Sequence, residues 1–150
     1  MLRIVIALLA AIAMVPVATP SIAADDDSSA QYITPYDAIW RAAADPDHGV
    51  RGTFKLTVRA WGQQRDTIYV NSEDDYRDQR NISIDLLPGA QAGVTEKLGA
   101  PDTLKGKSIL VKGVAKRVKI WFVTNGQQTS KYYYQTHIQV SDASQIRLAD

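Results

Sequence analysis

The sequence predicts an all-β domain: a five-stranded Greek-key barrel with a short helix before the first strand and a second helix between strands three and four. Two observations predict this class. From Val50 onward, apolar residues recur at every second position, which is the period of half-buried strands. The segments follow the order strand, strand, strand, helix, strand, strand, and the long fourth strand contains a glycine at which it can bend to close a barrel.

The first 23 residues have the features of an export signal. Arg3 gives a positive start, an apolar run follows, and small residues stand at the −3 and −1 positions of the bond after Ala23. We expect residues 1–23 to be removed, residues 24–33 to form a flexible linker, and residues 34–150 to form one domain. The sequence therefore predicts a periplasmic or secreted protein with no stable membrane insertion after cleavage; the alternative is an uncleaved N-terminal anchor.

Composition excludes several classes of function. The 150 residues include 17 basic and 16 acidic side chains, and loss of Arg3 leaves a formally neutral chain. A neutral chain is a poor candidate for coating nucleic acid by net charge alone. The absence of cysteine from the sequence excludes thiol catalysis, thiolate zinc sites and iron–sulfur clusters.

The leading helix and the first three strands follow from local signals. Thr34 as N-cap with Pro35 at the first helical position predicts a short helix that ends near Asp45. Alternation of apolar and polar residues then predicts strands from Val50 to Trp61, over residues 67–70 and over residues 82–86. Three successive antiparallel strands form a meander.

The second half of the domain contains one more helix and two long strands. Residues 88–98 are expected to be helical, and residues 108–123 and 132–140 are expected to be strands. Ile109 and Val111 have one parity, whereas three later apolar residues have the other: Val118, Ile120 and Phe122. This change predicts a bulge or kink near Gly113.

This order of elements is that of the five-stranded OB-fold. Four segments resemble small exported bacterial OB-fold proteins, which are described as nucleic-acid-binding-like. The segments are residues 50–59, 68–78, 104–113 and 138–147. The resemblance covers roughly residues 34–148. It implies the OB fold, and it makes nucleic acid a candidate partner.

Charge is distributed unevenly along the chain. Residues 25–49 have a net charge of −5, whereas residues 103–131 carry seven cations and no acidic residue. A neutral protein can therefore present a basic face. The alternative is that these lysines protect exposed strand edges from pairing with other chains.

Aromatic residues alternate with cations on the side of the strands predicted to face outward. Two loop arginines lie at the rim of the predicted ligand-binding site, which comprises Arg59, Trp61, Tyr69, Arg77, Arg80, Arg117, Lys119 and Trp121. Stacking and charge of this kind suit single-stranded nucleic acid. The same set can stack on sugars or contact a protein, and the alternative is that both tryptophans are covered by the leading helix or by the hairpin at Gly126.

The acidic loop from Glu73 to Asp78 is the candidate for chemistry. Its carboxylates have the chemistry of a hard-cation site, but they lack the spacing of a calcium loop, and no hydrolase or nucleotide-binding motif occurs. We expect no metal and no cofactor. The leading hypothesis is a non-catalytic exported OB-fold module that binds a polymeric or protein partner through its barrel face. The alternatives are a single-stranded nucleic-acid-binding protein and a metal-assisted hydrolase that uses this loop.

Overall fold

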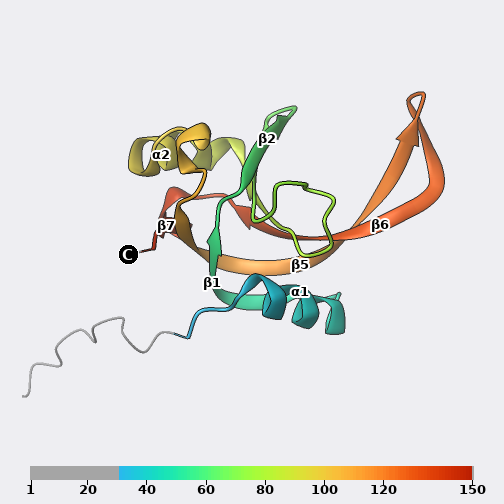
Figure 1. The fold of residues 1–150 in the computed structure, drawn as a ribbon, viewed down its shortest axis with the longest axis horizontal. Helices are drawn as coiled ribbons and strands as arrows, with labels where there is room; N and C mark the ends of the chain where they lie inside the picture. Colours follow the sequence, from blue (N-terminus) through green and yellow to red (C-terminus); the bar gives the residue numbers. More distant parts are fainter. Residues whose placement is uncertain (1–30, 150) are drawn as a thin grey trace, which may run out of the picture. The chain divides into compact units, whose positions relative to one another are not determined.

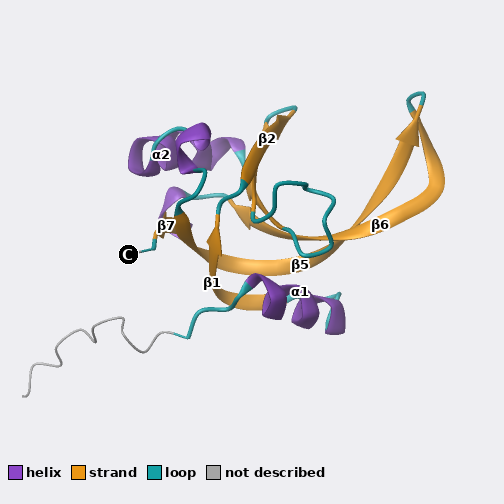
Figure 2. Cartoon of the chain, in the orientation of Figure 1, coloured by secondary structure: helices purple, strands orange, loops and turns teal. Residues whose placement is uncertain are grey.

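A seven-stranded sheet and two α helices form the part of the chain that the structure, a computed structural model, describes: residues 31–149 (Figures 1 and 2). The elements are α1 (Pro35–Ala44), β1 (Val50–Thr57), β2 (Ala60–Gln64), β3 (Thr67–Asn71), β4 (Ile82–Leu86), α2 (Pro88–Leu98), η2 (Pro101–Leu104), β5 (Ser108–Thr124), β6 (Gln127–Val140), η3 (Ala143–Gln145) and β7 (Ile146–Leu148). The predicted signal and most of the predicted linker lie outside the described residues. None of the described helices has the length and hydropathy needed to cross a membrane.

Helix α1 begins where its capping residues predict. The hydroxyl of Thr34 accepts a hydrogen bond from the backbone N–H of Asp37, and Pro35 occupies the first turn. Ala38 and Ala42 are fully buried against the sheet. Two small side chains one turn apart let the helix approach β1 and β5 closely.

The strands follow one hydrogen-bonded path, β1-β5-β6-β4-β3-β2, with β7 paired to β5. The pairing of β4 with β6 is parallel, and the other neighbours are antiparallel. The two ends of the path, β1 and β2, are consecutive in the sequence and are separated only by Val58 and Arg59. The mostly β prediction with two helices at the expected positions is confirmed, but the sheet has seven strands and is not closed.

The predicted first strand is divided because its backbone changes hydrogen-bonding partners. The N–H of Val58 donates to the carbonyl of Lys107, 2.9 Å away, whereas the N–H of Arg59 donates to the carbonyl of Asn71, also at 2.9 Å. Consecutive residues therefore bond to opposite neighbours. The chain passes from the β5 side to the β3 side at this point.

The core lies between the sheet and the two helices. Fully buried side chains come from every described strand except β2, with small contributions from α1 and α2 and one leucine from η2. The largest are Phe54, Ile82, Ile84, Leu86, Leu104, Ile109, Ile138 and Ile146. On β5 the buried series ends at Ala115, which lies opposite Ile138 of β6. Beyond this pair the two strands continue without a core beneath them.

The predicted bulge at Gly113 is wrong. Gly113 lies opposite Gly52, and the pairing of β5 with β1 and then β6 continues through it without a shift. A Cβ atom at Gly113 would lie 2.9 Å from Cγ2 of Ile138, so the glycine allows close approach of β6 rather than a kink. The register instead shifts between Trp121 and Val123.

The predicted orientation of the outer half of β5 changes accordingly. Because alternation is unbroken from Ile109 to Trp121, residues Arg117, Lys119 and Trp121 have the same parity as the core residues of β5. Val118, which was expected to face inward, lies on the other side. The cations thus follow the core side of the strand.

Candidate functional site

The outer part of the β5–β6 hairpin extends beyond its neighbours in the sheet. The pairing of β1 with β5 ends at Ala115, and the pairing of β4 with β6 begins at Thr136. Residues 116–124 and 127–135 therefore pair with each other alone among the described strands, and the hairpin rises away from the rest of the sheet (Figure 1). Its turn uses Asn125 and Gly126 at φ of 52° and 75°, which suits a two-residue hairpin turn.

Five side chains on the core-parity side of this hairpin form what we call the cation–aromatic face: Arg117, Lys119, Trp121, Tyr132 and Tyr134. Lys119 lies opposite Tyr134, and Trp121 lies opposite Tyr132. The three aromatic residues are partly exposed to solvent: the exposed fraction is 38% for Trp121, 47% for Tyr132 and 37% for Tyr134. The rings are therefore available to a ligand.

Contacts within this face hold the cations against the rings. The guanidinium carbon of Arg117 lies 3.7 Å from the centroid of Tyr134, and Nζ of Lys119 lies 4.5 Å from that of Tyr132. The rings of Trp121 and Tyr132 meet edge to face at 5.2 Å. Cation–π contacts at exposed sites contribute about 0.5–1 kcal/mol each, and they leave the charge of the cations in place.

Among residues 31–149, no carboxylate forms an ion pair with a cation of the hairpin. The sequence has no Asp or Glu between Asp102 and Asp142. The five cations of the two strands are Lys112, Lys116, Arg117, Lys119 and Lys131. Within residues 31–149, none of these cations forms an ion pair.

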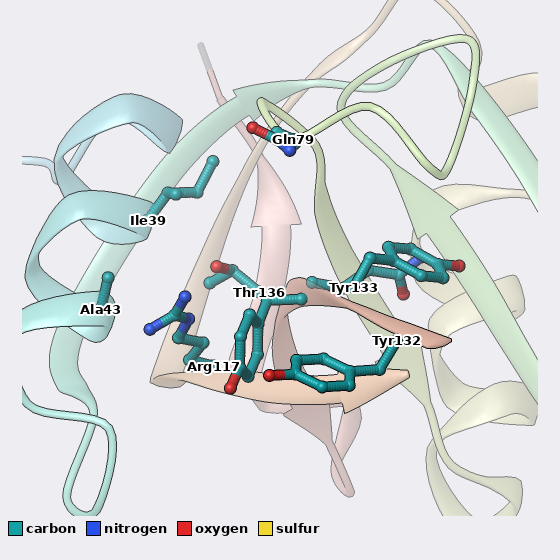
Figure 3. Close-up of a pocket in the computed structure, with 9 residues that line it drawn as sticks. Ile39, Ala43, Gln79, Arg117, Tyr132, Tyr133 and Thr136 are labelled. Carbon is teal, nitrogen blue, oxygen red and sulfur yellow. The ribbon is translucent and has the colours of Figure 1, made fainter. Parts of the chain in front are cut away.

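A recess of about 380 Å³ separates the base of this face from helix α1 (Figure 3). Ile39 and Ala43 of α1 line one side, and Arg117 reaches toward them from β5. The β3–β4 loop contributes Gln79, and β6 contributes residues 132–136. The recess therefore combines an apolar wall with a cation and phenol rings.

Tyr69 lies on the other side of the sheet. It pairs with Asp85 of β4, whose carboxylate oxygens both lie 2.9 Å from Nδ1 of His137. The side chains of His137 and Asp85 are only 12% and 11% exposed. Burial, together with the charge of Asp85, raises the pKa of Tyr69 above its ordinary value. His137, which alternates with the buried residues Thr136 and Ile138 of β6, belongs to this cluster.

Arg59 and Trp61 are also separate from the hairpin. Trp61 lies on β2 opposite Val70 and is 44% exposed. In the strand order, β2 is separated from β6 by β3 and β4. The structure thus brings together three of the predicted site residues, Arg117, Lys119 and Trp121, and leaves Arg59, Trp61 and Tyr69 elsewhere.

The loop arginines differ from each other. Arg80 holds Asp78 through two hydrogen bonds, of 2.7 and 3.0 Å. These hydrogen bonds, with that from the backbone N–H of Arg80, lower the pKa of Asp78 to about 2. Arg77 lies 4.7 Å from the ring centroid of Tyr76. The already paired Arg80 is a weaker candidate for ligand binding than Arg117.

The acidic loop uses its carboxylates to form its own turns. Asp75 and Asp78 accept hydrogen bonds from the backbone N–H groups of Arg77 and Arg80, and Asp74 lies 3.7 Å from Nζ of Lys105. In the described range, no three His, Cys, Asp or Glu side chains are grouped so as to hold a metal ion. The carboxylates of Asp74, Asp75 and Asp78 are therefore engaged in the turns of the loop and in the contact with Lys105.

Sequence reasoning did not include Tyr132 and Tyr134 in the site. Both continue the alternation of Val140, Ile138 and Thr136 along β6, so they stand on the core-parity side of the strand. The signal that would have found them is this unbroken period of two. That both tyrosines lie beside cations follows only from the pairing of β6 with β5, which places Tyr134 opposite Lys119 and Tyr132 opposite Trp121.

Comparisons with known proteins find no matching family and only distant structural similarity. No model of a protein family matches this chain, and no curated protein does. Among solved structures, it is similar to an aspartyl-tRNA synthetase from Entamoeba histolytica (10% identity, 90% of this chain and 27% of that one, TM-score 0.44). A protein described as an aspartyl-tRNA synthetase from Leishmania major Friedlin gives 9% identity, 87% and 23% coverage, and a TM-score of 0.43. The chain thus spans about a quarter of their length, and a likeness at these scores defines neither its fold nor its ligand.

Proposed function

We propose that this chain is a non-catalytic OB-type module that binds single-stranded nucleic acid on the cation–aromatic face of the β5–β6 hairpin. The strand order supports the OB assignment. If β1 and β2 are counted as one strand bent at Val58 and Arg59, and β7 as an addition, the five remaining strands have the Greek-key connections of that fold. In this count β4 is the third strand and β6 is the fifth, and these two strands pair in parallel.

One observation carries the choice of ligand: cations that have no ion-pair partner within residues 31–149 stand directly beside exposed rings. Arg117 and Lys119 are free to meet phosphates, and the release of counterions makes such contacts favourable. Trp121 and Tyr132 offer ring surface on which unpaired bases stack. The local charge of the hairpin replaces the net charge that the chain lacks.

A second candidate function, a protein-binding module, is favoured by helix α1. Tyr36 and Trp40 are 74% and 67% exposed and lie one turn apart. Large exposed aromatic residues of this kind are typical of protein interfaces.

We also propose that residues 1–23 are an export signal and that the protein is periplasmic or secreted. The basis is the basic start, the apolar run and the small residues before the bond after Ala23. N-terminal sequencing of the exported protein tests this. A mature chain that begins at Ala24 supports the proposal, and one that begins at Met1 contradicts it.

The ligand proposal is tested with a matched pair of neighbours. Trp121 lies on the cation–aromatic face, whereas the ring of Phe122 packs at 5.2 Å against Tyr133 and is 43% exposed. Trp121→Ala should weaken the binding of a fluorescent oligothymidylate by about five-fold or more, the loss of one stacked base, whereas Phe122→Ala should leave it nearly unchanged. No binding by the wild-type protein, or equal effects of the two changes, would contradict the proposal.

A further inference from the structure

The recess between α1 and the hairpin differs from the rest of the cation–aromatic face because it has walls on two sides. One wall is apolar: Ile39 is half-buried against the core, and Ala43 lies one turn further along α1. The other wall is Arg117, whose guanidinium lies 3.7 Å from the ring centroid of Tyr134. Arg117 extends from β5 toward the helix (Figure 3).

Two polar groups in the recess have no hydrogen-bond or ion-pair partner in the described part of the chain. Arg117 forms neither an ion pair nor a hydrogen bond there, and the side-chain amide of Gln79 forms no hydrogen bond. By contrast, Nε2 of Gln135 donates to the hydroxyl of Tyr133 and to the carbonyl of Tyr76, both at 3.0 Å. The recess thus holds free donors on one side and an apolar surface on the other.

We propose that this recess takes one unstacked base of the nucleic acid, held between the guanidinium plane of Arg117 and the apolar wall of Ile39 and Ala43. This inference rests on the function proposed above and locates one subsite of it. A planar guanidinium stacks on aromatic rings and on bases. The amide of Gln79 is then placed to hydrogen-bond the edge of the base.

The size of the recess favours a single nucleotide. Its volume of about 380 Å³ is near the lower end of the roughly 300–1,000 Å³ of small-ligand pockets. A stacked duplex does not present a separate base to such a recess, whereas a single strand does. The neighbouring nucleotides of the strand then lie along Tyr132 and Trp121, which continue the same face of the hairpin.

Two adjacent alanines at the end of α1 provide the test. Ala43 lines the recess, whereas Ala44 is exposed and does not line it. Ala43→Phe fills the recess from a solvent-accessible position, and Ala44→Phe adds the same ring on the same helix as a control. The probes are oligothymidylate and an abasic oligodeoxyribose phosphate of equal length, which has the same charge but no bases.

The expected result is a loss that depends on the bases. Ala43→Phe should weaken oligothymidylate binding by about five-fold or more, the contribution of one stacked base, and should leave the affinity for the abasic probe unchanged. Ala44→Phe should affect neither probe. Arg117→Lys, which keeps the charge but removes the stacking plane, should act as Ala43→Phe does.

The outcomes separate this inference from the proposed function. If the wild-type protein does not bind oligothymidylate, the function itself is refuted, and the subsite with it. If it binds but Ala43→Phe and Ala44→Phe are alike, the function stands and the base subsite is refuted. Equal loss of both probes in Ala43→Phe would also overturn the subsite, because the effect would then be on phosphate contacts or on the fold.

Discussion

Replacement of Asn81 by alanine should release the β3–β4 loop, because one buried amide holds it to the sheet. Nδ2 of Asn81 donates to Oδ1 of Asn71 at 3.0 Å and to the carbonyl of Tyr76 at 3.3 Å. Its Oδ1 accepts from the N–H of Glu73 at 3.2 Å and, more weakly, from the hydroxyl of Ser72 at 3.4 Å. Asn81 itself is 2% exposed, so water does not replace these bonds.

The magnitude follows from this count. Each hydrogen bond contributes a net of about 0.5–1.5 kcal/mol, and a buried group left without a partner costs about 1–3 kcal/mol. Because Asn71 is also buried, we expect Asn81→Ala to lower the free energy of unfolding by about 2–4 kcal/mol. For a domain of this size, Tm should fall by on the order of 10 °C.

Urea unfolding monitored by tryptophan fluorescence measures the change, with Gln128→Ala on the exposed hairpin as the control. Gln128 is an exposed residue of β6, so its replacement should change stability by no more than about 0.5 kcal/mol. A loss below about 1 kcal/mol for Asn81→Ala would refute the reasoning. It would mean that the loop is held by its own turns rather than by this amide.

Three further predictions concern charge, packing and pH. Lys119→Gln should reduce the slope of log K against log salt for oligothymidylate by about 0.7, the loss of one phosphate contact, and an unchanged slope would exclude that contact. Gly113→Ala should lower the free energy of unfolding by about 1–3 kcal/mol in thermal melts, since the new methyl group would overpack Ile138; an unchanged Tm would refute the close approach. In an NMR titration, the carboxyl of Asp78 should have a pKa of about 2. The stability that its pairing with Arg80 contributes is therefore complete above the ordinary carboxyl pKa and is lost as the pH falls through about 2. Arg80→Gln should return this pKa toward its ordinary value, and a normal pKa in the wild-type protein would refute the pairing.

The features that the sequence predicted correctly are those that interactions between near neighbours in the chain determine. The start of α1 depends on Thr34 and Pro35, which act within one turn, so the sequence was sufficient to place it. The division of the first strand at Val58 and Arg59 depends instead on the positions of Lys107 and Asn71, which are distant in the sequence. No pattern within residues 50–64 contains that information.

The site was predicted in part for a related reason. The outer half of β5 has apolar residues on one side and an alternating cationic and aromatic series on the other, and the sequence does not say which side faces the core. Because Val118 and Ile120 are apolar, the sequence predicted that their side of the strand faces the interior. In the structure they are only half-buried, on the side away from the cation–aromatic face. The unbroken register through Gly113 decides the orientation, and it is a property of the pairing with β1 and β6.

The same alternation builds the core at one end of the hairpin and the proposed binding surface at the other. Along β6, the positions that bury Val140 and Ile138 become Tyr134 and Tyr132 where the hairpin extends beyond β4. A cation–π contact places a cation beside an exposed ring without neutralising its charge, whereas an ion pair with a carboxylate does neutralise it. Arg80 would have to release Asp78 before it could bind a phosphate, whereas Arg117 lies over the ring of Tyr134 and keeps its full charge. A ligand that carries both phosphates and rings can therefore use this face without first breaking a salt bridge.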